Sequence, residues 1–131
     1  MDIKHMNIAE LQILAEDIRK KLIEVVSKNG GHLGPNLGVV ELTIAMHKVF
    51  NSPLDKFLFD VGHQSYVHKL LTDREDKFET IRKKGGLGPF TSRDESVHDH
   101  FVSGHAGNAL SASLGFALGE PESNILAVIG D

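Results

Sequence analysis

The stretch Phe57-Leu58-Phe59-Asp60-Val61-Gly62-His63 decides the fold that this sequence predicts. Its apolar run stops at a carboxylate, and a glycine-histidine turn follows directly. Buried strands of α/β sheets deliver polar groups in this way to the rim of the sheet, where ligands are usually held. We therefore expect a short buried strand over residues 56–60, with a polar site at its carboxyl end.

A second strand is expected over residues 125–129, where Ile125-Leu126-Ala127-Val128-Ile129 forms a continuous apolar run. Runs of this kind are typical of parallel strands that are covered on both faces. Segments with helical spacing of apolar residues outnumber the strands. The predicted class is therefore α/β and helix-rich, with a parallel sheet and flanking helices.

The clearest helical pattern covers residues 7–28, where apolar side chains recur at three- and four-residue steps. Asn7 can cap this helix, Glu10 stands where a capping box places a carboxylate, and Gly30-Gly31 can end it. The remaining expected elements are helices at 38–50, 64–71 and 78–84, a closely packed helix at 107–118, a loop at 32–36, a mobile surface loop at 85–96 and a turn at 121–124.

Composition limits the class of protein. The chain has 131 residues, 40% of them apolar, which suits one domain with a packed core. Its formal net charge is −4 with both signs mixed, so no nucleic-acid partner is expected. The chain has no cysteine, and its amino terminus lacks the apolar core of a signal peptide. No apolar stretch approaches the ~20 residues of a membrane span, so the expected location is the cytoplasm, without membrane contact.

Three glycine-histidine pairs, Gly31-His32, Gly62-His63 and Gly104-His105, are the candidates for binding chemistry. Two of them precede expected helices, where free backbone N–H groups and the helix dipole favour phosphate oxygens. Histidine can also move protons near neutral pH. Asp131 follows the last strand, a position typical of a magnesium ligand. Together these patterns predict one polar site for an anionic ligand and a metal; plain tight turns and a chain terminus are the alternatives.

The other five histidines are assigned no function. His5, His47, His98 and His100 are expected at the solvent or on helix faces, and His68 on a helix surface. A zinc site at His98-Asp99-His100 is disfavoured, because the spacing of the two histidines is poor for structural zinc and the chain has no cysteine to assist.

Several longer motifs stand in a fixed order along the chain. They are Gly30-Gly31-His32-Leu33-Gly34, Val40-Glu41-Leu42-Thr43, Phe59-Asp60-Val61-Gly62-His63-Gln64 with Tyr66 and His68-Lys69, Ile81-Arg82-Lys83-Lys84-Gly85-Gly86-Leu87, and Gly104-His105 with Ser111-Ala112. In order and spacing they resemble the amino-terminal part of the 1-deoxy-D-xylulose-5-phosphate synthase family, thiamine-diphosphate enzymes related to transketolase. Transketolase itself shares the histidine turns only in looser form.

The resemblance implies a fold, an activity and cofactors. It implies one incomplete thiamine-diphosphate-binding domain of the pyrophosphate type over residues 1–131, without the family's middle and carboxyl-terminal domains. The implied cofactors are thiamine diphosphate and Mg²⁺. The family reaction condenses pyruvate with glyceraldehyde 3-phosphate and releases carbon dioxide, and its product feeds isoprenoid (terpenoid), thiamine and pyridoxal precursors.

The resemblance also implies roles for individual residues. His63 contacts the cofactor, and Gly104-His105-Ala106 forms the turn beside the diphosphate and the pyrimidine end. His32 lies near the thiazolium and the substrates, where it can shuttle protons, so His32 and His63 are the candidate catalytic residues. Asp131 is the first magnesium ligand.

One departure from the family pattern falls in the third turn. Where the family usually has Ser-Ser-Thr-Ser, this chain has Ala106-Gly107-Asn108-Ala109. Backbone donors survive this change and side-chain hydroxyls do not. Asn108 can replace one hydrogen bond to the cofactor.

Because the implied site is unfinished, the isolated chain is expected to be inactive and to bind the cofactor weakly. Two other interpretations stay open. One is a non-catalytic binding or interaction module that kept the fold and lost the reaction. The other is one half of a split transketolase-type enzyme. The family forms dimers, which leaves a homodimer or a complementary chain open as partner.

Overall fold

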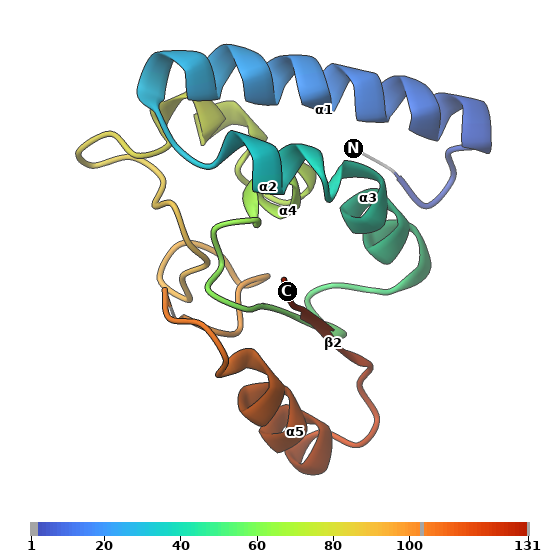
Figure 1. The fold of residues 1–131 in the computed structure, drawn as a ribbon. Coiled ribbons are helices and arrows are strands. Elements are labelled where there is room, and N and C mark those ends of the chain that lie inside the picture. The colour runs from blue at the N-terminus through green and yellow to red at the C-terminus, as the bar shows by residue number, and fades with distance from the viewer. Residues whose placement is uncertain (1–2, 103, 131) are drawn as a thin grey trace.

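A computed structural model describes residues 3–102 and 104–130. In chain order its elements are α1 (Ile8–Asn29), α2 (Leu33–Leu37), α3 (Val40–Val49), β1 (Lys56–Phe59), α4 (Tyr66–Leu71), the 3₁₀ helix η1 (Glu75–Thr80), α5 (Ala109–Gly119) and β2 (Ile125–Val128). Figure 1 shows α1 along one side of the molecule and α5 at the opposite end, with the strands between them. The predicted helix-rich α/β class is confirmed.

The two strands lie side by side and run parallel, with Phe57 opposite Leu126 and Phe59 opposite Val128. Within the described ranges they make up the whole sheet, and α4, η1 and α5 lie on the connection between them. The predicted buried strand is confirmed, since all three residues of β1 from Phe57 to Phe59 are almost inaccessible. The candidate site begins at the carboxyl end of this buried strand.

Strand β2 is less covered than the sequence predicts. Its residues are half-buried or exposed, and Ile129 directly after it is 45% exposed. Helix α5 packs against β2, but a hollow of about 340 Å³ remains between the strand and Leu42 and Met46 of α3. The expectation of a strand covered on both faces is therefore wrong for the described chain.

Helix α1 confirms the sequence signals at both of its ends. The Asn7 side chain accepts the Glu10 N–H at 3.0 Å, and the Glu10 carboxylate accepts the Asn7 N–H at 2.7 Å. These two bonds satisfy amides that the helix itself leaves without partners. At the other end, Gly30 has a φ of +74° and donates its N–H to the Val26 carbonyl at 2.8 Å. Helices α3, α4 and α5 each begin two residues later than predicted.

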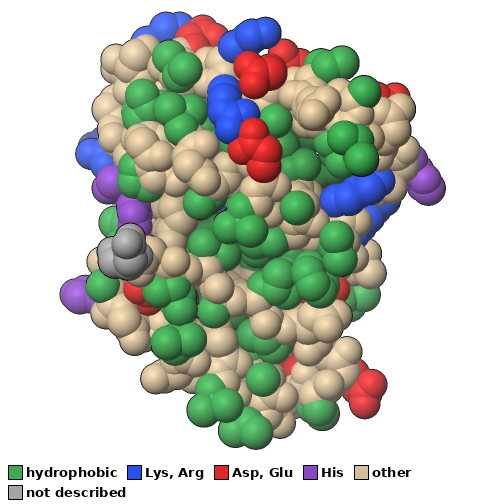
Figure 2. Space-filling view, turned by 45° about the vertical axis from the view of Figure 1, so that its right-hand side comes forward, with side chains coloured by type: hydrophobic (Ala, Val, Ile, Leu, Met, Phe, Trp, Pro, Cys, Tyr) green, Lys and Arg blue, Asp and Glu red, His purple; other side chains and the backbone are tan. Residues whose placement is uncertain are grey.

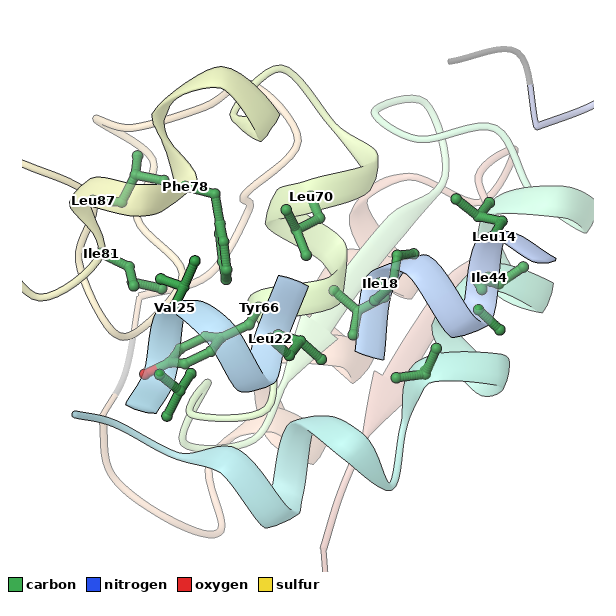
Figure 3. Packing of buried hydrophobic residues seen from close by; sticks show 14 of the residues in the cluster. Leu14, Ile18, Leu22, Val25, Ile44, Tyr66, Leu70, Phe78, Ile81 and Leu87 are labelled. Carbon is green, nitrogen blue, oxygen red and sulfur yellow. The ribbon is translucent and has the colours of Figure 1, made fainter. Parts of the chain in front are cut away.

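The hydrophobic core lies beneath the buried face of α1, as Figure 3 shows. Each fully buried side chain of this kind stabilises the fold by about 1.5–3 kcal/mol. Its members include Leu14, Ile18, Leu22 and Val25 of α1, Ile44 of α3, Tyr66 and Leu70 of α4, and Phe78, Ile81 and Leu87. The core therefore fixes α4, whose first residues adjoin the candidate site.

The predicted loop at 32–36 is wrong, because Leu33–Leu37 form the short helix α2. The fully buried side chain of Asn36 explains the difference. Its Nδ2 donates to the carbonyls of His32 at 2.6 Å and His63 at 2.8 Å, and its Oδ1 accepts the Tyr66 N–H at 2.8 Å. Two of these three partners are distant in sequence, so local glycine and proline signals could not reveal them.

The short helix predicted at 78–84 lies earlier, as η1. The Ile81 N–H donates to the Phe78 carbonyl at 3.1 Å, and Arg82 then turns the chain with a φ of +63°. Phe78 and Ile81 are both inaccessible to solvent. Burial of these two side chains holds the turn that ends at Ile81. The helix therefore lies before this residue and does not continue after it, as the sequence had predicted it would.

The segment 85–96 has no helix or strand, as predicted, but it is not simply a surface loop. Leu87, Thr91 and Ser96 are buried. The Glu95 carboxylate forms ion pairs with two buried cations, described below. This segment is therefore a packed part of the molecule.

Helix α5 is exposed over most of its surface, contrary to the expected close packing. Only Ala109 is buried, and Leu110, Leu114 and Leu118 are each more than 60% exposed. Figure 2 shows hydrophobic side chains across the middle and lower part of one face of the molecule. No helix within residues 3–102 and 104–130 is both long and apolar enough to span a membrane.

Candidate functional site

The structure brings together two of the predicted glycine-histidine turns. The ring centroids of His32 and His63 are 5.2 Å apart, with an edge-on geometry. Asn36 holds the backbones of both residues through the hydrogen bonds described above. The ring of Tyr66 lies 6.4 Å from that of His32. Two imidazoles and a phenol thus form one polar cluster next to the core.

Gly31 is required for this arrangement. Its φ is +133°, and a Cβ atom there would lie 2.8 Å from the Tyr66 hydroxyl and 3.1 Å from the Arg82 side chain. A side chain would be strained in this conformation and would collide with Tyr66. The glycine therefore allows the backbone before His32 to pass directly beside the phenol.

The polar cluster contains atoms that have no hydrogen-bond partner among the described residues. They are His32 Nδ1, His63 Nδ1 and the Tyr66 hydroxyl, all three buried. Such an atom costs about 1–3 kcal/mol when it stays unpaired, so native proteins usually provide it with a protein, water or ligand partner. Three of them in one cluster indicate a place for a polar ligand group.

Burial lowers the pKa of His32, and the neighbouring charges of His63 and Arg82 lower it further. The His32 imidazole is therefore neutral at neutral pH. A neutral imidazole can accept a proton, as the proton-shuttling role predicted from the sequence requires. Sequence reasoning gave Tyr66 no role; its position three residues after His63 is the signal that could have found it.

Replacing Tyr66 by phenylalanine is expected to leave the free energy of unfolding unchanged or to raise it by up to about 1 kcal/mol, because no described residue offers the buried hydroxyl a hydrogen bond. Urea unfolding of the two proteins measures this difference. The control is Tyr66→Ala, which removes the ring from the core and should cost about 3–5 kcal/mol. A loss of more than about 1 kcal/mol in Tyr66→Phe would show that the hydroxyl has a protein partner.

The third turn joins the cluster at the end of β1. The Gly104 N–H donates to the Val61 carbonyl at 2.9 Å. Phe90 lies between this turn and the histidines: its ring centroid is 6.3 Å from that of His32, and a Cβ at Gly104 would lie 3.7 Å from the same ring. All three predicted turns therefore meet at one rim of the sheet.

The backbone amides at the start of α5 are not free, contrary to the sequence-based expectation. The Asp60 carboxylate accepts the Gly107 N–H at 2.9 and 3.0 Å and the Ala109 N–H at 3.1 Å. These bonds, from Gly107 first and Ala109 second, lower the pKa of Asp60. An anionic ligand at this rim would find at least these two donors already engaged. Local sequence patterns could not predict this contact, because Asp60 is 47 and 49 residues away from its two partners.

The remaining predicted cofactor residues lie on the same turn. His105 and Ala106 are exposed, and Asn108 occupies the cap position of α5 without a side-chain capping bond. The predicted magnesium ligand, Asp131, lies outside the described residues. Among residues 3–102 and 104–130, no group of three or more histidine or carboxylate side chains is placed to hold a metal ion.

The expectation of surface positions is wrong for His47 and His68. Both are buried, and the Nε2 of His47 lies 2.9 Å from the Nδ1 of His68. The Nε2 of His68 lies 3.1 Å from the Asp99 carboxylate. Asp99 in turn accepts two hydrogen bonds from Arg74, at 2.7 and 2.9 Å. A buried ionic network therefore occupies positions that the sequence pattern placed at the surface.

The other three histidines lie near the surface. His98 is half-buried, with its Nδ1 2.8 Å from the Ser52 hydroxyl. His100 is half-buried beside Phe116, and His5 is exposed as predicted.

Comparison with known proteins shows the family to which the chain belongs. A family model described as 1-deoxy-D-xylulose-5-phosphate synthase matches residues 1–131. Proteins of that name are 58% identical in Chlamydia abortus, over 99% of this chain and 21% of the relative, and 57% identical in Fusobacterium nucleatum, over 93% and 20%. The protein of that name from Acidobacterium capsulatum is 54% identical over 99% of this chain and 21% of its own length. The chain thus spans about a fifth of the length of the curated relatives that it matches. It belongs, as an amino-terminal segment, to the 1-deoxy-D-xylulose-5-phosphate synthase family.

Proposed function

We propose that this chain forms one wall of the thiamine-diphosphate site of a synthase that condenses pyruvate with glyceraldehyde 3-phosphate and releases carbon dioxide. The observation that supports this best is the meeting of the three glycine-histidine turns at the end of β1. The Nδ1 atoms of His32 and His63 and the Tyr66 hydroxyl have no hydrogen-bond partner among the described residues, which fits a polar ligand there. In this proposal residues 1–131 are a single partial cofactor-binding domain.

The residues proposed to hold the cofactor are His63, the turn Gly104-His105-Ala106 and Asn108, with Asp131 as a ligand of Mg²⁺. When bound, thiamine diphosphate supplies the nucleophilic carbon and the electron sink that decarboxylation of pyruvate needs. Because the Gly107 and Ala109 amides are engaged by Asp60, the diphosphate has to be bound by other groups of the turn and by the metal.

His32 is proposed to hold and transfer a proton at its Nδ1 atom. This atom is buried and has no hydrogen-bond partner in the part of the chain that the structure describes, and the lowered pKa of His32 keeps the ring neutral before the reaction. The ring centroid of Phe90 lies 6.3 Å from that of His32. A proton-transfer residue in such a site typically contributes a factor of about 10²–10⁴ in rate.

A chimera tests the proposed function. Residues 1–131 replace the matching segment of the Chlamydia abortus synthase, and turnover of pyruvate with glyceraldehyde 3-phosphate is measured. The chimera is expected to be active, and His32→Gln in it should lower kcat/KM by about 100-fold. Lys20→Ala is the control, because this lysine is exposed on α1 and forms an exposed ion pair with Asp17 of the same helix. A folded chimera without activity would overturn the proposal.

The polypeptide of residues 1–131 by itself is expected to show no turnover and only weak binding of thiamine diphosphate with Mg²⁺. It spans about a fifth of its relatives, and catalysis with this cofactor needs a water-excluding, two-sided cleft. Calorimetry and product formation check these two expectations. Micromolar or tighter binding, or steady product formation, would contradict them.

A non-catalytic binding module is the second candidate. The turn Ala106-Gly107-Asn108-Ala109 lacks the hydroxyls usual in the family, and two of its own amide donors, those of Gly107 and Ala109, are engaged by Asp60. A chimera that binds the cofactor with normal affinity and forms no product would support this candidate. Such a result would then assign the loss of chemistry to this segment.

A further inference from the structure

We propose that Asp60 is a positioning residue that fixes the Gly104–Ala109 turn at the sheet rim in the geometry the anionic ligand requires. This inference rests on the proposed function and adds to it a residue that does not itself contact the ligand.

The backbone of Asp60 is fixed by the sheet. Its N–H donates to the Val128 carbonyl of β2 at 2.8 Å. Its carbonyl accepts the Gly62 N–H at 2.7 Å and the Gln64 side-chain amide at 3.1 Å. The residue is 7% exposed. The backbone from which the carboxylate projects is therefore held by hydrogen bonds to β2 and to the following turn. Burial leaves the Asp60 side chain little conformational freedom.

The carboxylate replaces the local cap that α5 lacks. Asn108 makes no side-chain capping bond, so the first amides of the helix need an acceptor from elsewhere. Asp60 supplies it to Gly107 and Ala109, across a separation of 47 and 49 residues. An anion at this position also interacts favourably with the helix dipole. One side chain thus sets the distance between β1 and the beginning of α5.

The consequence for the site follows from connectivity. His63 lies three residues after Asp60, and His105 lies two residues before Gly107. A second bond, from the Gly104 N–H to the Val61 carbonyl, connects the beginning of the third turn to the residue that follows Asp60. The position of the third turn relative to the other two therefore depends on the carboxylate together with this backbone bond.

A second aspartate provides a matched control. Asp55 stands before β1, is also 7% exposed, and accepts the Asn51 N–H at 2.7 Å and the Asn124 N–H at 2.9 Å. It holds the opposite end of the strand, away from the turn. Asp55→Asn and Asp60→Asn thus remove the same charge from comparable surroundings at different ends of β1.

The first measurement is amide hydrogen exchange by NMR on the 131-residue chain. Asp60→Asn is expected to lower the protection of the Gly107 and Ala109 amides by about 10-fold or more, the effect of weakening a bond to a charged acceptor. The Asn124 amide should be unaffected. Asp55→Asn should give the opposite pattern. Unchanged protection at Gly107 in Asp60→Asn would overturn the proposal.

The second measurement is cofactor affinity in the chimera described above. Asp60→Asn is expected to weaken the binding of thiamine diphosphate with Mg²⁺ by about 10-fold or more, whereas Asp55→Asn should leave it unchanged. Equal affinity in the two variants would overturn the positioning role even if the exchange result holds. If the unsubstituted chimera does not bind the cofactor at all, the proposed function fails and the exchange result still stands on its own.

If Asp60→Asn does not fold, the unsubstituted chain keeps the proposal testable. The amide shifts of Gly107 and Ala109 should then titrate together, with one common midpoint below the ordinary value for a carboxyl group. Independent or absent titration of these two amides would overturn the proposal.

Discussion

Asp99→Ala is expected to lower the free energy of unfolding by about 3–5 kcal/mol, because it removes one partner of a buried ion pair and leaves the other uncompensated. Arg74 is 2% exposed and directs both terminal nitrogens at the Asp99 carboxylate. The same carboxylate is also bound by His68 at 3.1 Å and by the Ser92 N–H at 2.8 Å. Alanine can replace none of these interactions.

The other members of the network cannot replace the negative charge of Asp99. Glu95 lies 3.0 Å from Arg74 but also pairs with the fully buried Lys69. Without Asp99, Glu95 would be left between two buried cations, and the other carboxylate beside Arg74, that of Asp73 at 3.7 Å, is 54% exposed. Because domains of this size are stable by only about 5–15 kcal/mol, the variant should be close to unfolding at ambient temperature.

Urea unfolding followed by circular dichroism measures this effect. The control is Glu24→Ala, which breaks an exposed pair with Lys28 on the surface of α1. Exposed pairs of this kind contribute little to stability, so its midpoint should not move. A loss below about 1 kcal/mol in Asp99→Ala would contradict the importance of the network.

Acid should destabilise the protein well above the range in which ordinary carboxylates titrate. Burial first, and then the charges of His68, His98, Lys4 and Arg74, lower the pKa of His47 from 6.5 to about 3. The folded state therefore binds fewer protons than the unfolded state between these two values. The contribution of His47 is fully present above pH 6.5 and is lost progressively as the pH falls toward 3.

The expected size follows from the shift of the pKa. Each unit is equivalent to about 1.4 kcal/mol, so His47 alone should cost about 2 kcal/mol by about pH 5. Burial also lowers the pKa of His68, which adds to the loss in the same direction. Burial alone would raise the pKa of Asp99, but its hydrogen bonds from His68 and Arg74 lower it overall. Asp99 therefore adds a further loss only below its usual value of 3.8.

The measurement is the urea midpoint from about pH 7 to about pH 4. His47→Gln is the matched variant, because its side-chain amide can still donate a hydrogen bond to His68 Nδ1 and does not titrate. It should show a shallower dependence on pH, whatever its stability at neutral pH. Equal slopes in the two proteins would rule out His47 as the source.

Local signals in the sequence predicted the parts of the fold that depend on local physics. The capping box at Asn7 and Glu10 and the glycine after Asn29 mark the two ends of α1 through hydrogen bonds between residues close in sequence. Apolar runs predicted both strands, and their parallel pairing followed from the helices between them. What the sequence could not reveal depends on long-range contacts: Asn36 makes α2 helical through His63 and Tyr66.

The candidate site shows the same division. The three glycine-histidine turns were recognisable in the sequence, and the structure brings them together. The engagement of the α5 amides by Asp60 was not predictable, because glycine-rich turns look alike whether their donors are free or bound. The buried positions of His47 and His68 were missed because a polar residue on a helix reads as exposed until its partner, here Asp99, is known.

Asn36 has a consequence for the engineering and the evolution of this segment. One carboxamide connects both imidazole-bearing turns to the first peptide of α4, beside fully buried side chains of the core. Any repacking that displaces this helix by a fraction of an ångström is transmitted to the spacing of the two rings. Selection for stability of the fold and selection for the geometry of the two histidines therefore act on the same contacts of Asn36. A substitution that changes one of these properties is expected to change the other.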